Sequence, residues 1–198
     1  MAVKRMLIIH GWGNRRPAHH WHRNLANELR RTGNVVAYPQ LPNTDSPVLS
    51  DWLDVVAVEL DMLGEIGTGE LVVIGHSLGC LTWLHAVKAK LVSEIADRVL
   101  LVAPADPDLC GEAATFQLDL HDEDLRAAVH AAAGKTLLVS SEADPWLPRG
   151  LSETFARPLQ LPLHIIHGAR HFALEDNWTP WQGVINWVNN PHADLDER

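Results

Sequence analysis

The sequence predicts an α/β fold, a three-layer sandwich in which a parallel sheet of about six strands carries helices on both faces. Two observations lead to this prediction. Short apolar runs rich in β-branched residues alternate along the chain with segments of helical periodicity. Polar residues directly follow several of these runs, as at the carboxyl ends of parallel strands in such folds. The 198 residues suit a single domain, expected over residues 1–190, with a polar and unstructured tail at 191–198.

The expected strands are apolar runs bounded by glycine, proline or polar residues. They comprise residues 6–9, 35–38, 71–74, 99–102, 136–140 and 163–166. Because strands and helices alternate, we expect parallel pairing with right-handed crossovers.

The expected helices carry apolar residues on one side. In the first, Trp21, Leu25 and Leu29 are spaced four apart, and Gly33 ends the helix. The last begins with Thr179 as N-cap and Pro180 at the first helical position. The remaining helices are expected after a cap at Ser50 or Asp51, directly after Gly79, at 122–133 and at 149–155.

Residues 71–81 contain the strongest functional signal. Four apolar residues lead into Gly75-His76-Ser77-Leu78-Gly79, and apolar residues follow at helical spacing. Gly-x-Ser-x-Gly between a strand and a helix is the pattern of a nucleophile elbow. Its turn is so tight that the Ser is strained and a Cβ at either flanking position would collide with a neighbouring strand or helix. Ser77 is therefore the candidate nucleophile.

A serine hydroxyl needs a base within hydrogen-bond reach, and histidine suits this role because its unperturbed pKa is about 6.5. His171 lies in the loop between the last strand and the last helix, and is the candidate base. Asp144 follows a predicted strand and lies between Ser77 and His171 along the chain, which matches a known order of catalytic triads. We expect Asp144 to orient the base, and activity to decline below about pH 6.5.

Other residues compete for these two roles. His76 adjoins Ser77, but on a strand it should point to the opposite face of the sheet. An ordinary Asp-Pro turn would account for Asp144 without catalysis. The alternatives left open are His167 for the base, and Glu142, Asp106 or Asp108 for the carboxylate.

An acyl-transfer site also needs donors for the developing oxyanion, each worth about 10²–10³ in rate. The backbone N–H of Leu78, at the start of the helix after Ser77, is one candidate. The second should come from the loop after the first strand. There we choose the N–H of Trp12, with that of Gly13 as the alternative.

Composition excludes several classes of partner. The net charge of −9 argues against nucleic acid and anionic membrane surfaces, and no apolar run is long enough for a signal peptide or a membrane span. Cys80 and Cys110 form no disulfide framework, so we expect a cytoplasmic protein, with Cys80 packed in the core. No cofactor is expected and no protein partner is predicted. No metal is expected either, because neighbouring residues on a helix diverge; a solvated helix end is the simpler interpretation of His19, His20 and His22.

With these residues placed, the chain resembles the α/β-hydrolase fold over nearly its whole length. More closely it resembles the small serine hydrolases related to retinoblastoma-binding protein nine, the YdeN-like family. The resemblance implies that Ser77 is the nucleophile, Asp144 the orienting carboxylate and His171 the base, with oxyanion contacts from the loop after the first strand. Members often have Gly directly before the base, where this chain has Arg170. The motifs that carry the resemblance are His10-Gly11, His20-Trp21, Gly75-His76-Ser77-Leu78-Gly79, Ser141-x-x-Asp144-Pro145 and His171.

These residues predict a serine hydrolase of carboxylesterase type that cleaves a small ester, thioester or activated amide through an acyl-enzyme. Only about thirty residues separate the strands at 99–102 and 136–140, which leaves no room for a large cap domain. The pocket should therefore be shallow or covered by loops, and accept a small-molecule acyl substrate. A non-catalytic interaction module, an acyltransferase or a carbon–carbon hydrolase on the same fold are the alternatives. The side chains expected to line the pocket are Trp12, Trp146, Leu147 and Phe172.

Overall fold

The structure is a computed structural model that describes residues 3–109 and 111–198, so Cys110 lies outside the described residues. Its centre is one six-stranded parallel sheet, as expected from the apolar runs. The strands are β1 (Lys4–Ile9), β2 (Val35–Ala37), β3 (Glu70–His76), β4 (Ala96–Val102), β5 (Ala133–Ser140) and β6 (Leu163–Ile165). Their order across the sheet is β2-β1-β3-β4-β5-β6.

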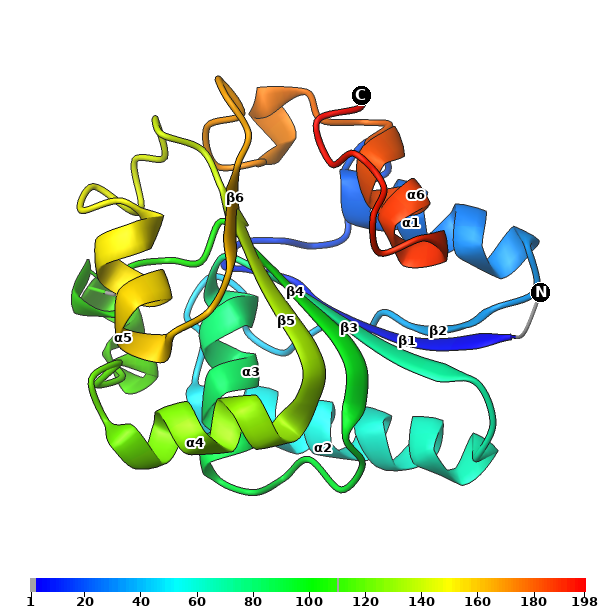
Figure 1. Cartoon of the computed structure of the whole chain (residues 1–198), viewed down its shortest axis with the longest axis horizontal. Coiled ribbons are helices and arrows are strands. Elements are labelled where there is room, and N and C mark those ends of the chain that lie inside the picture. Colours follow the sequence, from blue (N-terminus) through cyan, green and yellow to red (C-terminus); the bar gives the residue numbers. More distant parts are fainter. Residues whose placement is uncertain (1–2, 110) are drawn as a thin grey trace.

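Helices cover both faces of this sheet and make a three-layer sandwich (Figure 1). Two helices, α1 (Trp21–Arg31) and α6 (Gln182–Asn189), lie together on one face. The opposite face carries α2 (Leu49–Ile66), α3 (Leu78–Lys88), α4 (Glu123–Ala132) and the short α5 (Arg157–Leu159). Between β4 and β5 the described residues form two 3₁₀ turns and α4, with no additional domain above the sheet.

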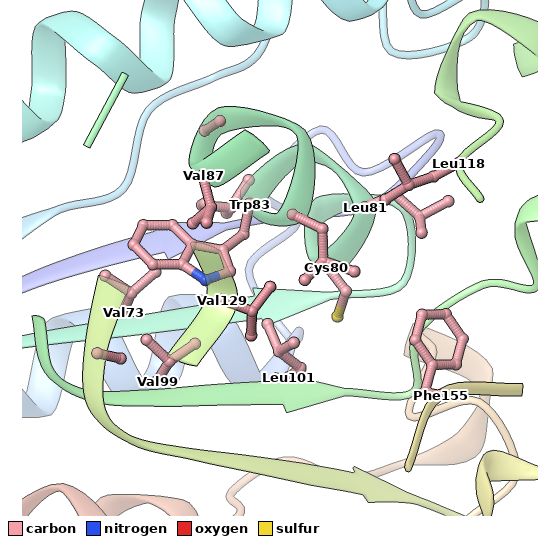
Figure 2. Close-up of a cluster of buried hydrophobic side chains, with 14 of the residues drawn as sticks. Val73, Cys80, Leu81, Trp83, Val87, Val99, Leu101, Leu118, Val129 and Phe155 are labelled. Atoms are coloured by element: carbon pink, nitrogen blue, oxygen red, sulfur yellow. The ribbon is translucent and has the colours of Figure 1, made fainter. Parts of the chain in front are cut away.

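Two hydrophobic cores result, one on each face of the sheet. Along β1, Leu7 and Ile9 pack toward α2 and α3, whereas Met6 and Ile8 pack toward α1 and α6. Both faces of the strands are buried, and the sequences of the strands are therefore continuous apolar runs rather than alternating patterns. Figure 2 shows the larger core, where Cys80 packs among aliphatic side chains as predicted. Burial raises the pKa of its thiol well above the usual value, so the group stays protonated.

Three element boundaries differ from the prediction. Helix α2 has Val48 as N-cap, without a side-chain bond, in place of Ser50 or Asp51. Helix α6 starts at Gln182, because the Thr179 hydroxyl does not cap it but donates to the His19 carbonyl oxygen, 2.7 Å away. The short helix expected at 149–155 lies at 152–159, where a π-helical turn leads into α5. Local sequence signals cannot register such long-range hydrogen bonds.

The segment after Pro191 was expected to be unstructured, and this expectation is wrong. Leu195 is buried, and its carbonyl oxygen accepts a 2.8 Å hydrogen bond from the indole Nε1 of Trp181. The Gly183 N–H donates to the carbonyl oxygen of Glu197 at 2.7 Å. One apolar side chain and two backbone carbonyls thus fix this polar segment on α6. None of the described helices combines the length and apolarity that crossing a membrane requires.

Candidate active site

The turn between β3 and α3 holds Ser77 in a conformation that side chains rarely adopt. Its φ is 54° and its ψ is −122°, and such strain concentrates at functional sites. A Cβ on Gly79 would lie 2.3 Å from the Ile9 carbonyl oxygen, and one on Gly75 would lie 3.1 Å from the Cα of Cys80. The collisions expected at both flanking positions are therefore present, with β1 on one side and α3 on the other.

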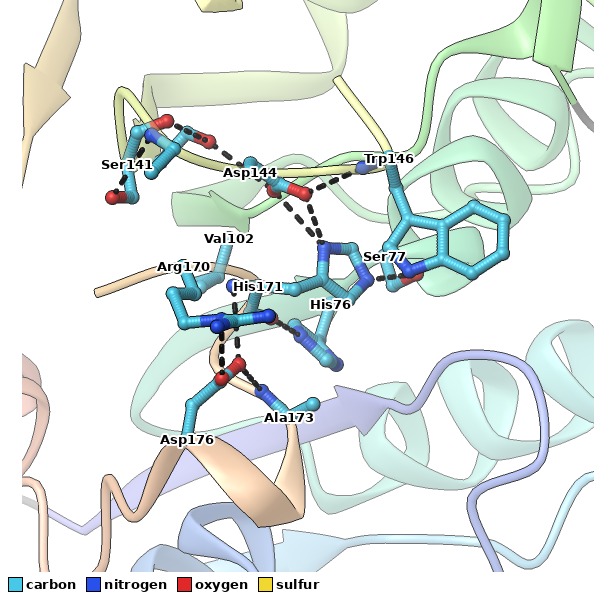
Figure 3. Close-up of polar contacts among 12 residues, drawn as sticks. His76, Ser77, Val102, Ser141, Asp144, Trp146, Arg170, His171, Ala173 and Asp176 are labelled. Carbon is cyan, nitrogen blue, oxygen red and sulfur yellow. Dashed lines mark hydrogen bonds and ion pairs between the residues drawn. The ribbon is translucent and has the colours of Figure 1, made fainter. Parts of the chain in front are cut away.

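Ser77, His171 and Asp144 form one chain of hydrogen bonds at the carboxyl edge of the sheet (Figure 3). The Ser77 Oγ lies 2.9 Å from His171 Nε2, and His171 Nδ1 lies 2.9 and 3.0 Å from the two carboxylate oxygens of Asp144. An ionised carboxylate only accepts, so Nδ1 carries the proton and the Nε2 lone pair faces the hydroxyl. The Trp146 backbone N–H also donates to Asp144, at 2.9 Å, and the Asp144 side chain is fully buried.

The alternative residues for these roles are engaged elsewhere. Glu142 accepts from the Gly168 N–H at 3.2 Å, and His167 is exposed with its Nδ1 3.5 Å from Glu142. Asp106 pairs with Arg149 at 2.6 Å. The structure therefore brings together the three residues predicted first and leaves the alternatives outside the hydrogen-bonded chain.

The loop that carries His171 is fastened by a residue that the sequence analysis missed. The carboxylate of Asp176 accepts from the backbone N–H groups of His171, at 3.1 Å, and Ala173, at 3.0 Å. It also pairs with Arg170, whose Nε lies 3.1 Å away. Arg170 and Phe172 both have a φ of 55°, so the chain is strained on either side of the histidine. Arg170 thus adopts the left-handed conformation in which related proteins often place Gly, and an acidic residue shortly after the histidine was the available signal.

The two residues predicted to supply oxyanion donors, Trp12 and Leu78, line the same pocket as Ser77. The Leu78 N–H lies at the start of α3, where the helix offers no acceptor. In the loop after β1, the Gly13 N–H already donates to the Thr44 carbonyl oxygen at 2.9 Å, whereas no bond of the Trp12 N–H is found within the described residues. A Cβ on Gly11 would lie 2.7 Å from Ser77 Cβ, which shows how closely this loop approaches the serine.

A pocket of about 540 Å³ opens over Ser77 and His171. Of the four side chains expected to line it, Trp12 and Trp146 do, with 36% and 52% of their surfaces exposed. The expectation is wrong for Leu147 and Phe172, which are buried in the two cores. The apolar wall is completed by residues that the sequence analysis did not name: Pro17, Ala105, Leu109, Ala173 and Leu174.

His20 and His22 do not form the solvated helix end that was expected. His20 is the N-cap of α1 and His22 lies in its first turn, yet both are buried, and only their neighbour His19 is exposed. They meet His76, which points away from Ser77 as predicted. Burial lowers the pKa of His20 to about 4 and holds those of His22 and His76 well below the usual value, so all three are neutral near pH 7.

Comparisons with known proteins concern the fold and the family of the chain. The chain is 25% identical over 182 residues to YdeN of Bacillus subtilis (strain 168), a protein named as a hydrolase, with 89% of this chain and 90% of YdeN covered. The crystal structure of the B. subtilis ydeN product superposes with a TM-score of 0.78 at 21% identity, covering 94% of this chain and 97% of the other. A structure reported among the carboxylesterases of Nitrososphaera gargenis superposes with a TM-score of 0.63 at 13% identity, covering 94% and 90%.

The profile of the serine hydrolase family matches residues 6–190, a range that contains Ser77, Asp144 and His171. Its match covers nearly the entire chain, and the structural neighbours share the α/β-hydrolase fold. The chain therefore belongs to the serine hydrolase family, and it is similar to the YdeN hydrolase.

Proposed function

We propose that this hydrolase is a carboxylesterase that cleaves small esters through a covalent acyl-enzyme, with Ser77 as nucleophile, His171 as general base and Asp144 as the group that orients the base. The observation that carries the proposal is the continuous chain of 2.9 Å contacts from the Ser77 hydroxyl through the imidazole to the buried carboxylate. The three side chains come from distant parts of the sequence and meet at these distances. Acyl transfer uses these three groups, a nucleophile, a base and a carboxylate that orients the base.

In the first half of the reaction, His171 Nε2 takes the proton from the Ser77 hydroxyl as Oγ attacks the carbonyl carbon. The carbonyl oxygen becomes an oxyanion, which the backbone N–H groups of Trp12 and Leu78 stabilise. The tetrahedral intermediate then expels the alcohol, and the imidazolium returns its proton to that leaving oxygen. Asp144 holds the Nδ1 proton and stabilises the imidazolium throughout.

In the second half, His171 takes a proton from water, and the resulting hydroxide attacks the acyl carbon. The same two N–H groups stabilise the second oxyanion. Ser77 leaves with the proton from His171, so the acid is released and the enzyme is restored. An acyltransferase would replace this water by another acceptor, and no feature of the pocket favours such an acceptor.

The pocket supports a small, uncharged substrate. Its wall is mainly apolar, with Trp12 and Trp146 near the reacting atoms, and Glu175 is the one acidic residue among the described residues that line it. A carboxylate opposes a second negative charge, so anionic acyl chains should bind poorly. Because no cap domain extends the pocket, short acyl chains fit and long ones must project into solvent.

A series of p-nitrophenyl esters from acetate to decanoate tests the proposal. We expect kcat/KM to be largest for the short chains, and to be lost in Ser77→Ala with the fold retained. Rates that rise steadily toward decanoate would contradict the short-chain preference. Equal rates for the wild type and Ser77→Ala would contradict the proposed nucleophile.

A further inference from the structure

Three histidine rings form a buried cluster beside the candidate active site. His20 and His22 come from the start of α1, and His76 from the end of β3. The ring centroids are 4.4 Å apart for His20 and His22, 5.1 Å for His22 and His76, and 5.8 Å for His20 and His76. One nitrogen of each ring lies within 4.8 Å of the other two. Three nitrogen donors therefore converge on one point.

Several of these nitrogens are buried without a hydrogen-bond partner. Both ring nitrogens of His22, and Nδ1 of His76, are in this state in the described part of the chain. Native structures contain few such atoms, and a missing ion or water is a common explanation. The convergence of the rings favours an ion, since one ion satisfies three lone pairs at once.

The protonation states fit metal binding. Since the imidazoles are neutral, each keeps one nitrogen lone pair. His76 Nε2 lies 2.8 Å from the His171 carbonyl oxygen, so Nε2 carries the proton and Nδ1 presents the lone pair. Metal-binding histidines commonly use this arrangement, with the second nitrogen donating to a backbone carbonyl. The Nδ1 atom of His20 accepts a hydrogen bond from the His22 N–H at 3.2 Å. A neutral imidazole has a single nitrogen lone pair, so a metal ion bound by His20 replaces this capping bond.

The spacing of the three imidazoles and their access from the pocket also fit metal binding. Tetrahedral Zn²⁺ with bonds of about 2.05 Å holds its nitrogen ligands about 3.4 Å apart, so the rings must approach slightly. His20 and His76 border the pocket above Ser77, which gives the ion a path inward and leaves its fourth position open to water. Three imidazoles without a carboxylate suit Zn²⁺ and similar ions, whereas Mg²⁺ and Ca²⁺ prefer oxygen ligands.

We propose that His20, His22 and His76 form a binding site for a divalent transition-metal ion of the Zn²⁺ type at the base of the pocket. The site has a consequence for the reaction, which rests on the function proposed above. The His76 ring lies 5.2 Å from the His171 ring and is hydrogen-bonded to its backbone. A dication held there opposes the positive charge that His171 acquires during acyl transfer, so bound Zn²⁺ inhibits hydrolysis.

The test measures Zn²⁺ binding directly. Protein freed of metal by a chelator is titrated near neutral pH by calorimetry, with elemental analysis after dialysis. His22→Phe removes the two unpartnered nitrogens, and His20→Asn removes a ligand while keeping a good N-cap. His19→Asn is the matched control, because His19 is exposed and adjoins the cluster. Circular dichroism checks that each variant folds, and either cluster variant alone can decide the result.

We expect one Zn²⁺ per chain in the wild type and in His19→Asn, with at least about 100-fold weaker binding in His22→Phe and His20→Asn. Co²⁺ in the same site should give the visible absorption of tetrahedral nitrogen coordination. Equal binding in all four proteins would assign the ion to surface histidines and overturn the proposal, as would no binding at about 1 mM Zn²⁺. These results do not depend on ester hydrolysis, so failure of the metal site and failure of the esterase proposal are distinguishable.

Discussion

The rings of His171 and His22 both lie close to the ring of His76, but the surroundings of the two differ sharply. Both ring nitrogens of His171 have partners at 2.9 Å, a hydroxyl on one side and a carboxylate on the other. Both ring nitrogens of His22 are buried without a partner. The partners of His171 fix the tautomer of its imidazole, whereas burial, together with the neighbouring imidazoles, lowers the pKa of His22. Leaving a buried polar group unpaired costs about 1–3 kcal/mol, so the cluster lowers the stability of the metal-free protein.

The largest effect should come from removing the paired imidazole. His171→Ala leaves Ser77 without a base, and we expect kcat/KM for a short p-nitrophenyl ester to fall by about 10³-fold or more. With both proteins freed of metal, His22→Phe removes an unpaired imidazole and should stay within about twofold of the wild type, since His22 contacts neither Ser77 nor His171. A similar loss of kcat/KM in both variants would show that the hydrogen-bond partners of His171 do not distinguish its role in the reaction from that of His22.

Asp144→Asn tests what the carboxylate contributes to the tautomer of His171. The amide nitrogen can donate to Nδ1, which moves the imidazole proton to Nε2 and removes the lone pair that faces Ser77. We expect kcat to fall by about 10²–10⁴-fold with KM nearly unchanged. Glu142→Gln, which alters the neighbouring carboxylate, is the matched control and should retain activity. A loss below about threefold in Asp144→Asn would rule out this role.

Asp176→Asn should have a smaller effect, because Asp176 acts through the backbone of the His171 loop. Removing its charge weakens the bonds to two N–H groups, so His171 occupies its productive position less often, and we expect kcat to fall about tenfold at constant KM. Arg170→Gly removes the ion pair with Asp176, but glycine readily adopts the positive φ of this position, so the activity should fall little. An unchanged kcat in Asp176→Asn would show that the loop holds its shape without the carboxylate.

The smallest effect concerns stability and pH. His10 and His20 have pKa values of about 4 in the folded protein, and those of His22 and His76 are also lowered, all by burial. The unfolded chain therefore binds more protons between about pH 6.5 and the lower folded values, so stability is full above about pH 6.5 and is lost as pH falls toward about 4. In His22→Phe, the fall in Tm between pH 7 and pH 5 should shrink by a few degrees. An identical pH dependence in both proteins would contradict a neutral, buried His22.

The sequence analysis succeeded where local physics decides the outcome. Buried parallel strands need apolar runs, and the tight turn needs glycine on both sides of Ser77, so the sheet and the strained turn at Ser77 could be predicted. The meeting of Asp144 and His171 with Ser77 could be predicted because parallel strands bring their carboxyl ends to one edge. The geometry of all three agrees with those predictions.

The errors concern side-chain direction and long-range packing. Phe172 adjoins His171 in sequence, but its ring stacks on Trp181 at 4.8 Å, inside the core of the other face. His20 and His22 precede or begin a helix with polar residues around them, and only the packing of α1 on β3 buries them. Asp176 contacts backbone N–H groups, and an acidic residue shortly after the histidine was the only sequence signal for these contacts. Each of these outcomes depends on where a distant segment lies.

Reaction with a fluorophosphonate, followed by peptide mass analysis, tests the central claim most directly. Such a reagent reacts with a serine only when a base has activated it and an oxyanion site supports the adduct. We predict one adduct per chain, on the peptide that carries Ser77, which disappears in Ser77→Ala and is strongly slowed in His171→Ala. An adduct on another residue, or equal labelling of Ser77 in His171→Ala, would contradict the account.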